Sequence, residues 1–329
     1  MSVEGAARPA TAADVAARAG VSRATVSHIL NGREARFPEE TRRRVRAAAV
    51  ELDYRPSPAG RSLVRGRTDT IVVLMPNTTI GANVQEAVES LASGTAGTNV
   101  VLRFADGDPD ATVTALLELR PFAVVDLGSL SPEGRARLAA QGVTTVPTTD
   151  PGFDTDGQDV DEGIAELQVA ELCKRGPRRI VYVALADGRP DPFSPHRLAA
   201  IRRACARRGL PEPEMVGVPV DTAGALSVLR PVYEGAPVGI AAYNDLVALA
   251  ALSVAARLGT DVPGHVAVVG MDRIDVGQLW SPRLTTVDVD MRSLMDATIV
   301  ELNAAMRGTD LPPPRPQREA LSLVVGEST

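Results

Sequence analysis

The stretch TAADVAARAGVSRATVSHILNG, residues Thr11 to Gly32, decides the fold of the amino-terminal part of this chain. Gly20 can take the left-handed conformation that ends a helix, and Ser22 is a suitable N-cap for the next one. The following apolar residues recur at spacings of three and four: Val26, Ile29 and Leu30. The stretch predicts two short helices joined by a tight turn, a motif that lays its second helix in the DNA major groove. An ordinary helical hairpin is the competing interpretation.

The outward face of the second helix supplies the candidate DNA contacts. The forked guanidinium of Arg23 can bridge O6 and N7 of guanine, with a phosphate contact as its alternative. Ala24 can offer a methyl contact to thymine, and His28 can donate to guanine or to phosphate. The remaining candidates carry hydroxyl or amide groups, which position the protein on backbone phosphates; they are Thr11, Ser22, Thr25, Ser27 and Asn31.

The charge of the chain is unevenly distributed. Residues 1–67 contain 13 arginines and 7 acidic residues, whereas the remainder contains 22 basic and 34 acidic residues. A basic region that precedes an acidic one is typical of a DNA-binding head joined to a body that is kept off DNA. Several of these arginines lie in a third predicted helix, from about Pro38 to Leu52.

The first 70 residues resemble the start of the LacI/GalR family of bacterial transcription regulators. The matching segments are Asp14-Val-Ala, Ala19-Gly-Val-Ser, Thr25-Val-Ser, Leu30-Asn-Gly, Glu40-Thr-Arg, Tyr54-Arg-Pro and Arg61-Ser-Leu. The resemblance implies a helix-turn-helix domain over residues 11–56, after a flexible arm over 1–10, and a hinge helix and linker over 57–67. Leu63 matches the family's leucine that wedges into the minor groove, and Arg61 flanks it.

The body, residues 68–329, alternates apolar strands with helical stretches, which predicts parallel sheets covered by helices. The predicted strands are Thr70–Met75, Val100–Phe104, Ala123–Leu127, Val143–Val146, Arg179–Leu185, Met215–Val220, Val238–Tyr243, Val266–Gly270, Leu284–Val289 and Leu321–Val325. The expected fold is therefore a small all-α helix-turn-helix head plus an α/β body.

By the same resemblance, the body is an effector-binding and dimerisation domain of two parallel-sheet subdomains, like a periplasmic binding protein. Subdomain one would comprise about 68–149 and 288–311, and subdomain two about 150–284 and 312–329. Pro195 to Ala200 resembles the helix start where the family has an effector-binding arginine, here Arg197, and Tyr243-Asn-Asp resembles its Asn-Asp signature. The candidate effector contacts are Asn77, Arg197, Tyr243, Asp245, Asp272 and Trp280.

The resemblance is incomplete after Met75-Pro76. The family usually has an aromatic segment there, whose ring can stack on a sugar, whereas this chain reads Asn77-Thr-Thr-Ile-Gly. The expected effector is a sugar or another metabolite, and a regulator that has lost small-molecule sensing stays open as an alternative.

Other functional classes have little support in the sequence. The two cysteines, Cys173 and Cys205, have no metal-ligand spacing, so neither a metal nor a cofactor is expected. A signal peptide and an apolar run of membrane-spanning length are missing, so we expect a cytoplasmic protein without membrane contacts. An α/β enzyme or transport protein with an added head is the distant alternative. We therefore expect a homodimeric repressor that binds double-stranded operator DNA and a small effector.

Overall fold

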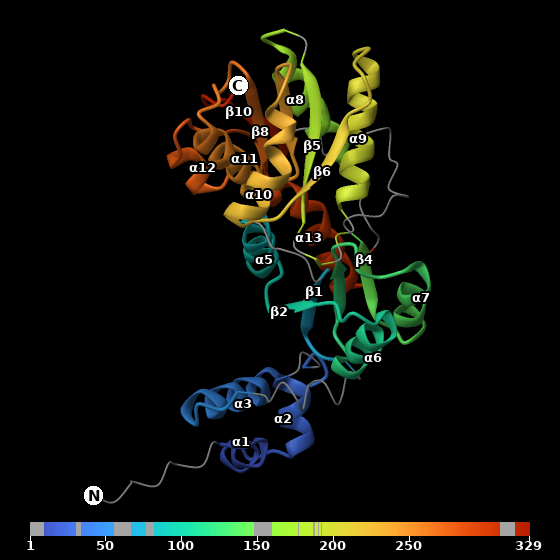
Figure 1. The fold of residues 1–329 in the computed structure, drawn as a ribbon. Helices are drawn as coiled ribbons and strands as arrows, with labels where there is room; N and C mark the ends of the chain where they lie inside the picture. The colour runs from blue at the N-terminus through green and yellow to red at the C-terminus, as the bar shows by residue number, and fades with distance from the viewer. Residues whose placement is uncertain are drawn as a thin grey trace, which may run out of the picture. The chain divides into compact units, whose positions relative to one another are not determined.

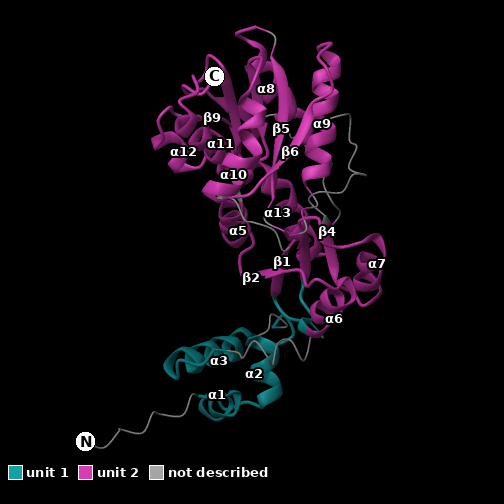
Figure 2. Ribbon diagram, viewed as in Figure 1, with its two compact units in different colours: residues 1–69, 119–122 teal, residues 70–118, 123–329 magenta. Residues whose placement is uncertain are grey.

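The computed structural model describes residues 10–30, 34–55, 67–76, 82–147, 160–176, 178–186, 188–189, 191, 193–309 and 320–329. The chain divides into two compact units, residues 1–69 with 119–122, and residues 70–118 with 123–329 (Figure 2). We call residues 10–55 of the first unit the head and the second unit the body.

The head begins with the predicted helix-turn-helix, α1 (Ala12–Ala19) followed by α2 (Arg23–Leu30). Thr11 and Asp14 form a capping box at the start of α1, in which each side chain bonds the other residue's backbone N–H. Gly20 has a φ of 65°, so it ends α1 in the left-handed conformation that the sequence predicted. The Ser22 hydroxyl accepts a hydrogen bond from the Thr25 N–H at 3.0 Å, as expected of an N-cap.

Helix α3 (Glu39–Glu51) completes the head. Pro38 is the N-cap residue and lies just before the helix. Its carbonyl accepts hydrogen bonds from the backbone N–H groups of Thr41 and Arg42. The three helices share one small core, in which the buried members are Val15, Ala16, Ala19, Val26, Ile29, Val45, Ala48 and Ala49. This core fixes α2 against α1 and α3 and leaves the opposite face of α2 exposed.

The body contains a four-stranded parallel sheet in the order β2-β1-β3-β4 (Figure 1). Its strands are β1 (Thr70–Met75), β2 (Asn99–Phe104), β3 (Ala123–Asp126) and β4 (Thr144–Pro147), and the helices between them are α5 (Ala82–Gly94), α6 (Pro109–Leu119) and α7 (Pro132–Ala140). The central strands are buried along their lengths, as is usual for a parallel sheet covered on both faces.

A second sheet of six strands has the order β10-β9-β8-β7-β5-β6. Its strands are β5 (Arg179–Leu185), β6 (Glu214–Val218), β7 (Val238–Ala242), β8 (Val266–Met271), β9 (Thr285–Val289) and β10 (Leu321–Val324). The accompanying helices are α8 (Val160–Cys173), α9 (Ser194–Arg207), α10 (Thr222–Leu229), α11 (Asp245–Leu258), α12 (Asp275–Leu279) and α13 (Met291–Arg307), with a 3₁₀ turn, η1 (Pro231–Tyr233).

All ten strands predicted from the sequence are present, and each begins and ends within two residues of its expected bounds. The predicted parallel pairing holds for the other strands of both sheets, and β10 differs from them in running antiparallel to β9. A strand at the edge of a sheet has one neighbour, so the pairing pattern of the other strands does not fix its direction.

Helix α13 follows a strand of the second sheet but packs on elements of the first, α5 and β4. The crossing of α5 and α13 is close: a Cβ on Gly94 would lie 2.7 Å from side-chain atoms of Ile299. The Asn303 side chain also donates to the Gly94 carbonyl at 2.9 Å. The chain then returns to the second sheet as β10.

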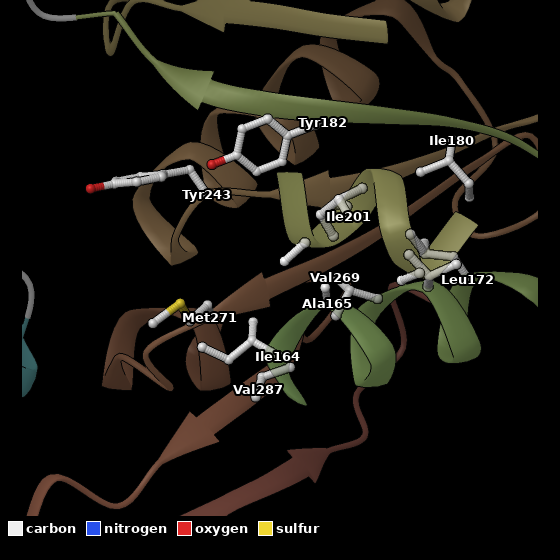
Figure 3. Packing of buried hydrophobic residues seen from close by; sticks show 14 of the residues in the cluster. Ile164, Ala165, Leu172, Ile180, Tyr182, Ile201, Tyr243, Val269, Met271 and Val287 are labelled. Carbon is white, nitrogen blue, oxygen red and sulfur yellow. The ribbon is translucent and has the colours of Figure 1, made fainter. Parts of the chain in front are cut away.

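The second sheet has a hydrophobic core on each face. One core lies between the sheet and helices α8 and α9, and Figure 3 shows part of it, including Leu172, Ile201, Tyr182 and Tyr243. The other core joins the opposite face to α10 and α11. No helix among the described residues has the length and apolar character needed to cross a membrane.

Candidate DNA-reading helix and ligand pocket

The outward face of α2 presents the residues that the sequence proposed for base contacts. Arg23 and Ala24 are exposed, while Ser27 and His28 are half-buried. The His28 ring lies 6.2 Å from the ring of Phe37, so Phe37 supports one side of the imidazole.

The arginines of the head differ in their partners. Arg18 pairs with Glu51 at 2.8 Å, Arg42 with Glu39 and Arg46 with Glu34 at 2.5 Å each, and Arg43 with Glu40. Arg23 makes no ion pair with any residue that the structure describes. Its guanidinium can therefore bind a base without first leaving a carboxylate of the described residues.

Three of the residues expected to contact phosphates have local partners. The Thr11 hydroxyl donates to the Asp14 carboxylate at 2.7 Å, and the Ser22 and Thr25 hydroxyls lie 2.9 Å apart. These contacts stabilise the starts of α1 and α2, so the same hydroxyls have a structural role whether or not they reach DNA. Asn31, Arg61 and Leu63 lie outside the described residues, as does the proposed hinge helix.

A small pocket lies at the carboxyl ends of β5, β7 and β8, the edge of a parallel sheet where ligands usually bind. Its enclosed space is small, on the order of one water molecule, and it is partly open to solvent. Its walls combine apolar and polar side chains from both sheet and helices, namely Asp161, Ile164, Ala165, Gln168, Tyr182, Arg197, Ile201, Ala242, Tyr243 and Met271.

Arg197, in the first turn of α9, lines this pocket, and it is one of the residues that the sequence proposed as effector contacts. One guanidinium nitrogen, Nη1, donates to the Tyr243 carbonyl at 3.1 Å, and Nε lies 3.4 Å from Asp161 Oδ1. The guanidinium carbon lies 4.6 Å from the centre of the Tyr243 ring and 5.7 Å from that of Phe193. The guanidinium is thus held between aromatic rings and a carboxylate.

Burial disfavours the charge of Arg197, but the nearby carboxylates, that of Asp161 above all and also that of Asp272, outweigh it, so the pKa of Arg197 lies above its ordinary value. Arg197 is therefore a permanent cation here. The carboxylates of Asp161 and Asp272 lie close enough to act on this charge.

Tyr243 follows β7 directly and is buried. Its hydroxyl donates to Asp191 Oδ1 at 3.1 Å, and that oxygen also accepts from the backbone N–H groups of Phe193 and Ser194. Burial raises the pKa of Tyr243, which keeps the phenol protonated as a donor. In Figure 3 the hydroxyl of Tyr182, on β5, points to the same side as that of Tyr243.

Three polar residues of this site, Asp161, Gln168 and Asp191, were not predicted from the sequence. Gln168 is buried in the middle of α8, and its amide nitrogen donates to the carbonyls of Ala242 at 2.9 Å and Gly270 at 3.1 Å. The available signal was a glutamine between Leu167 and Val169, because an amide that is buried with apolar neighbours needs hydrogen-bond partners. Asp161 and Asp191 had no comparable sequence signal.

Asp245, which the sequence proposed as an effector contact, lies away from the pocket. The residue is 0% exposed and does not line the pocket. Its Oδ1 accepts from the Thr286 hydroxyl at 2.6 Å, and its Oδ2 accepts from the Ile274 N–H at 2.9 Å. Asp245 thus joins the start of α11 to the loop after β8 and to β9.

The other expected effector contacts have different positions. Asp272 follows β8 directly, is half-buried, and lies near enough to Arg197 to raise its pKa. Trp280 ends α12, is 38% exposed and does not line the pocket. Asn77 lies outside the described residues. No group of three potential metal-ligating side chains occurs in the described part of the chain.

Two family models match the chain. Residues 11–57 match bacterial regulatory proteins of the lacI family, and residues 169–329 match a periplasmic binding protein-like domain. The chain is 31% identical over 295 residues to the HTH-type transcriptional repressor PurR of Vibrio parahaemolyticus, covering 84% of this chain and 86% of the relative. It is 29% identical over 291 residues to the HTH-type transcriptional regulator GalR of Escherichia coli, covering 84% of each protein.

Solved structures share this fold. A lac repressor dimer bound to operator and the anti-inducer ONPF has a TM-score of 0.75 at 22% identity, covering 98% of this chain and 99% of that one. A complex of the transcriptional regulator CelR with cellobiose has a TM-score of 0.64 at 25% identity, covering 97% of this chain and all of the other.

Proposed function

From the premise that this chain belongs to the lacI family of bacterial regulatory proteins, and so is a DNA-binding transcription regulator, we propose that it is a repressor acting as a dimer on a two-fold symmetric operator. The exposed Arg23 at the start of α2 carries the proposal for DNA reading. A single recognition helix contacts too few base pairs for selectivity in a genome, so two half-sites are needed.

The DNA proposal is tested by selecting bound duplexes from a random pool and then comparing two arginine variants. Arg23→Ala should reduce discrimination at one base pair of each half-site, by roughly 1–3 kcal/mol. Arg44→Ala removes another exposed arginine of the head and should lower the affinity for all DNA sequences by the same factor. Selected sites without inverted symmetry, or an Arg23→Ala variant that loses affinity equally for every base, would refute the assignment.

An exposed apolar face on α12 supports the dimer. Val276 and Leu279 are three residues apart on α12, Trp280 follows the helix directly, and Leu279 is 86% exposed. A second copy that covers this face about a two-fold axis would match the symmetry of the operator. Leu279→Asp should shift the protein toward monomers in sedimentation experiments, whereas Val220→Asp, which changes an exposed apolar residue elsewhere, should not. A Leu279→Asp variant that stays dimeric would place the interface elsewhere.

The pocket beside Arg197 supports control by a small neutral molecule that is rich in hydroxyl groups. Hydroxyl groups can donate to carboxylates and accept from a guanidinium, whereas an anion would meet Asp161, Asp191 and Asp272 as well as the arginine. Such a ligand controls DNA binding if it binds two arrangements of the body with different affinities.

Calorimetry tests this ligand class with cellobiose and other neutral sugars, and with their phosphate esters as charged counterparts. We expect heat from a neutral sugar and none from its ester. Arg197→Ala should abolish that heat and leave operator binding intact, while Arg202→Ala, on the same helix but paired with Glu212, should retain it. If neither class binds, the regulator without small-molecule sensing becomes the better description.

A further inference from the structure

The turn after β8 contains two consecutive residues with left-handed backbones. Asp272 has a φ of 103° and Arg273 a φ of 50°, in the region that glycine favours and other residues rarely adopt. Such a conformation persists where neighbouring groups hold it in place.

Asp245 supplies the group that holds this turn. Its Oδ2 accepts from the N–H of Ile274, the residue that follows the left-handed pair, at 2.9 Å. Its Oδ1 is fixed from the other side by the Thr286 hydroxyl at 2.6 Å. One buried carboxylate therefore anchors the turn to both α11 and β9.

The chain also leaves room for this carboxylate. A Cβ on Gly270, in β8, would lie 2.0 Å from Asp245 Oδ1, which is closer than atoms can approach. The position of the carboxylate therefore requires a glycine at position 270. Three elements take part in the anchor: α11 carries Asp245, β8 leaves room for its carboxylate and β9 supplies the Thr286 hydroxyl.

The turn carries Asp272, whose charge acts on Arg197 in the proposed effector site. We propose that Asp245 is a positioning residue for that site, holding the left-handed turn and so fixing the backbone that carries Asp272 at the end of β8. The inference rests on the proposed function of the pocket, but its geometry can be tested without an effector.

Amide hydrogen exchange of the full-length protein tests the anchor directly. Thr286→Val removes the hydroxyl that fixes Asp245, and Gly270→Ala forces the carboxylate to move. Both should accelerate exchange of the segment 272–279 by roughly tenfold or more relative to the native protein. Thr286→Ser keeps a hydroxyl and should restore slow exchange. Unchanged exchange in both Thr286→Val and Gly270→Ala would overturn the proposal.

A pH profile separates positioning by the charged group from simple packing. Burial raises the pKa of Asp245 to about 7, against the lowering effect of Thr286 and Ile274, and the neighbouring carboxylate of Asp272 raises it further. Trp280, the one tryptophan of the chain, follows the turn by way of α12 and reports on it by fluorescence. The native protein should show a fluorescence transition near neutral pH.

Asp245→Asn should remove that transition, because asparagine does not titrate. Asp275→Asn, which removes an exposed carboxylate from α12, should leave it unchanged. A transition that survives in Asp245→Asn would overturn the inference. Failure to find an effector would instead count against the proposed function, since neither measurement contains a ligand.

Discussion

Replacing Asp245 with asparagine should change how the stability of the body depends on pH. The side chain is fully buried, and desolvation raises the pKa of its carboxyl from 3.8 to about 7. The folded protein therefore binds this proton more tightly than the unfolded chain does. Since the native state then holds more protons than the unfolded state between about pH 4 and pH 7, the free energy of unfolding falls as the pH rises through that window.

The size of the effect follows from the shift. About three pKa units correspond to roughly 4 kcal/mol, of which roughly 3 kcal/mol falls between pH 5 and pH 8. Asparagine has almost the same shape and does not titrate. The free energy of unfolding of the native protein, minus that of Asp245→Asn, should therefore decrease by roughly 3 kcal/mol over that range.

Urea unfolding followed by Trp280 fluorescence measures this difference at both pH values. The tryptophan lies in the body, so the signal does not include melting of the head. Asp275→Asn serves as the control for removing a carboxylate nearby. Parallel pH dependence in the native protein and in Asp245→Asn would refute the reasoning, because it would mean that this carboxyl titrates alike in the folded and unfolded chain.

Three further substitutions test the packing and capping described above. Thr11→Ala removes the capping box of α1 and should lower the stability of the head by about 1 kcal/mol, as measured by its thermal unfolding monitored by circular dichroism. Gly94→Val places atoms where α5 meets Ile299 and should cost the body roughly 1–3 kcal/mol in urea, whereas an equal stability would mean that the helices separate freely. Tyr233→Phe removes a buried hydroxyl that donates to the Ala251 carbonyl at 2.9 Å, and should cost about 1 kcal/mol in the same assay; a neutral result would indicate that water replaces it.

Much of the fold could be predicted because the preferences of neighbouring residues match the helices, turns and strands that form. Gly20 permits the turn of the helix-turn-helix, and apolar runs mark every strand of both sheets. The direction of β10 could not be predicted, since an edge strand is constrained by one neighbour and by the path of the chain rather than by its residues.

The candidate ligand pocket was predictable only in part. Arg197 and Tyr243 meet there, as expected from residues that open a helix and end a strand at the same edge of a sheet. Asp245 was expected to face the ligand, but its carboxylate bonds Thr286 instead, because Gly270 has no side chain and leaves space on that side. The direction of a side chain at a helix start thus depends on a glycine in another strand, and such pairings are not visible in a single sequence.

The ion pairs of the head have a consequence for how DNA binding responds to salt. A phosphate contact made by a free arginine releases condensed counterions from the duplex, and the logarithm of affinity falls with the logarithm of salt by about 0.9 for each contact. Arg18, Arg42, Arg43 and Arg46 already have carboxylate partners, which repel phosphate and must be shared or displaced. The slope measured in a salt titration should therefore be shallower than the number of arginines in the head suggests. Neutralising Glu39 and Glu40 should steepen it without adding a single positive charge.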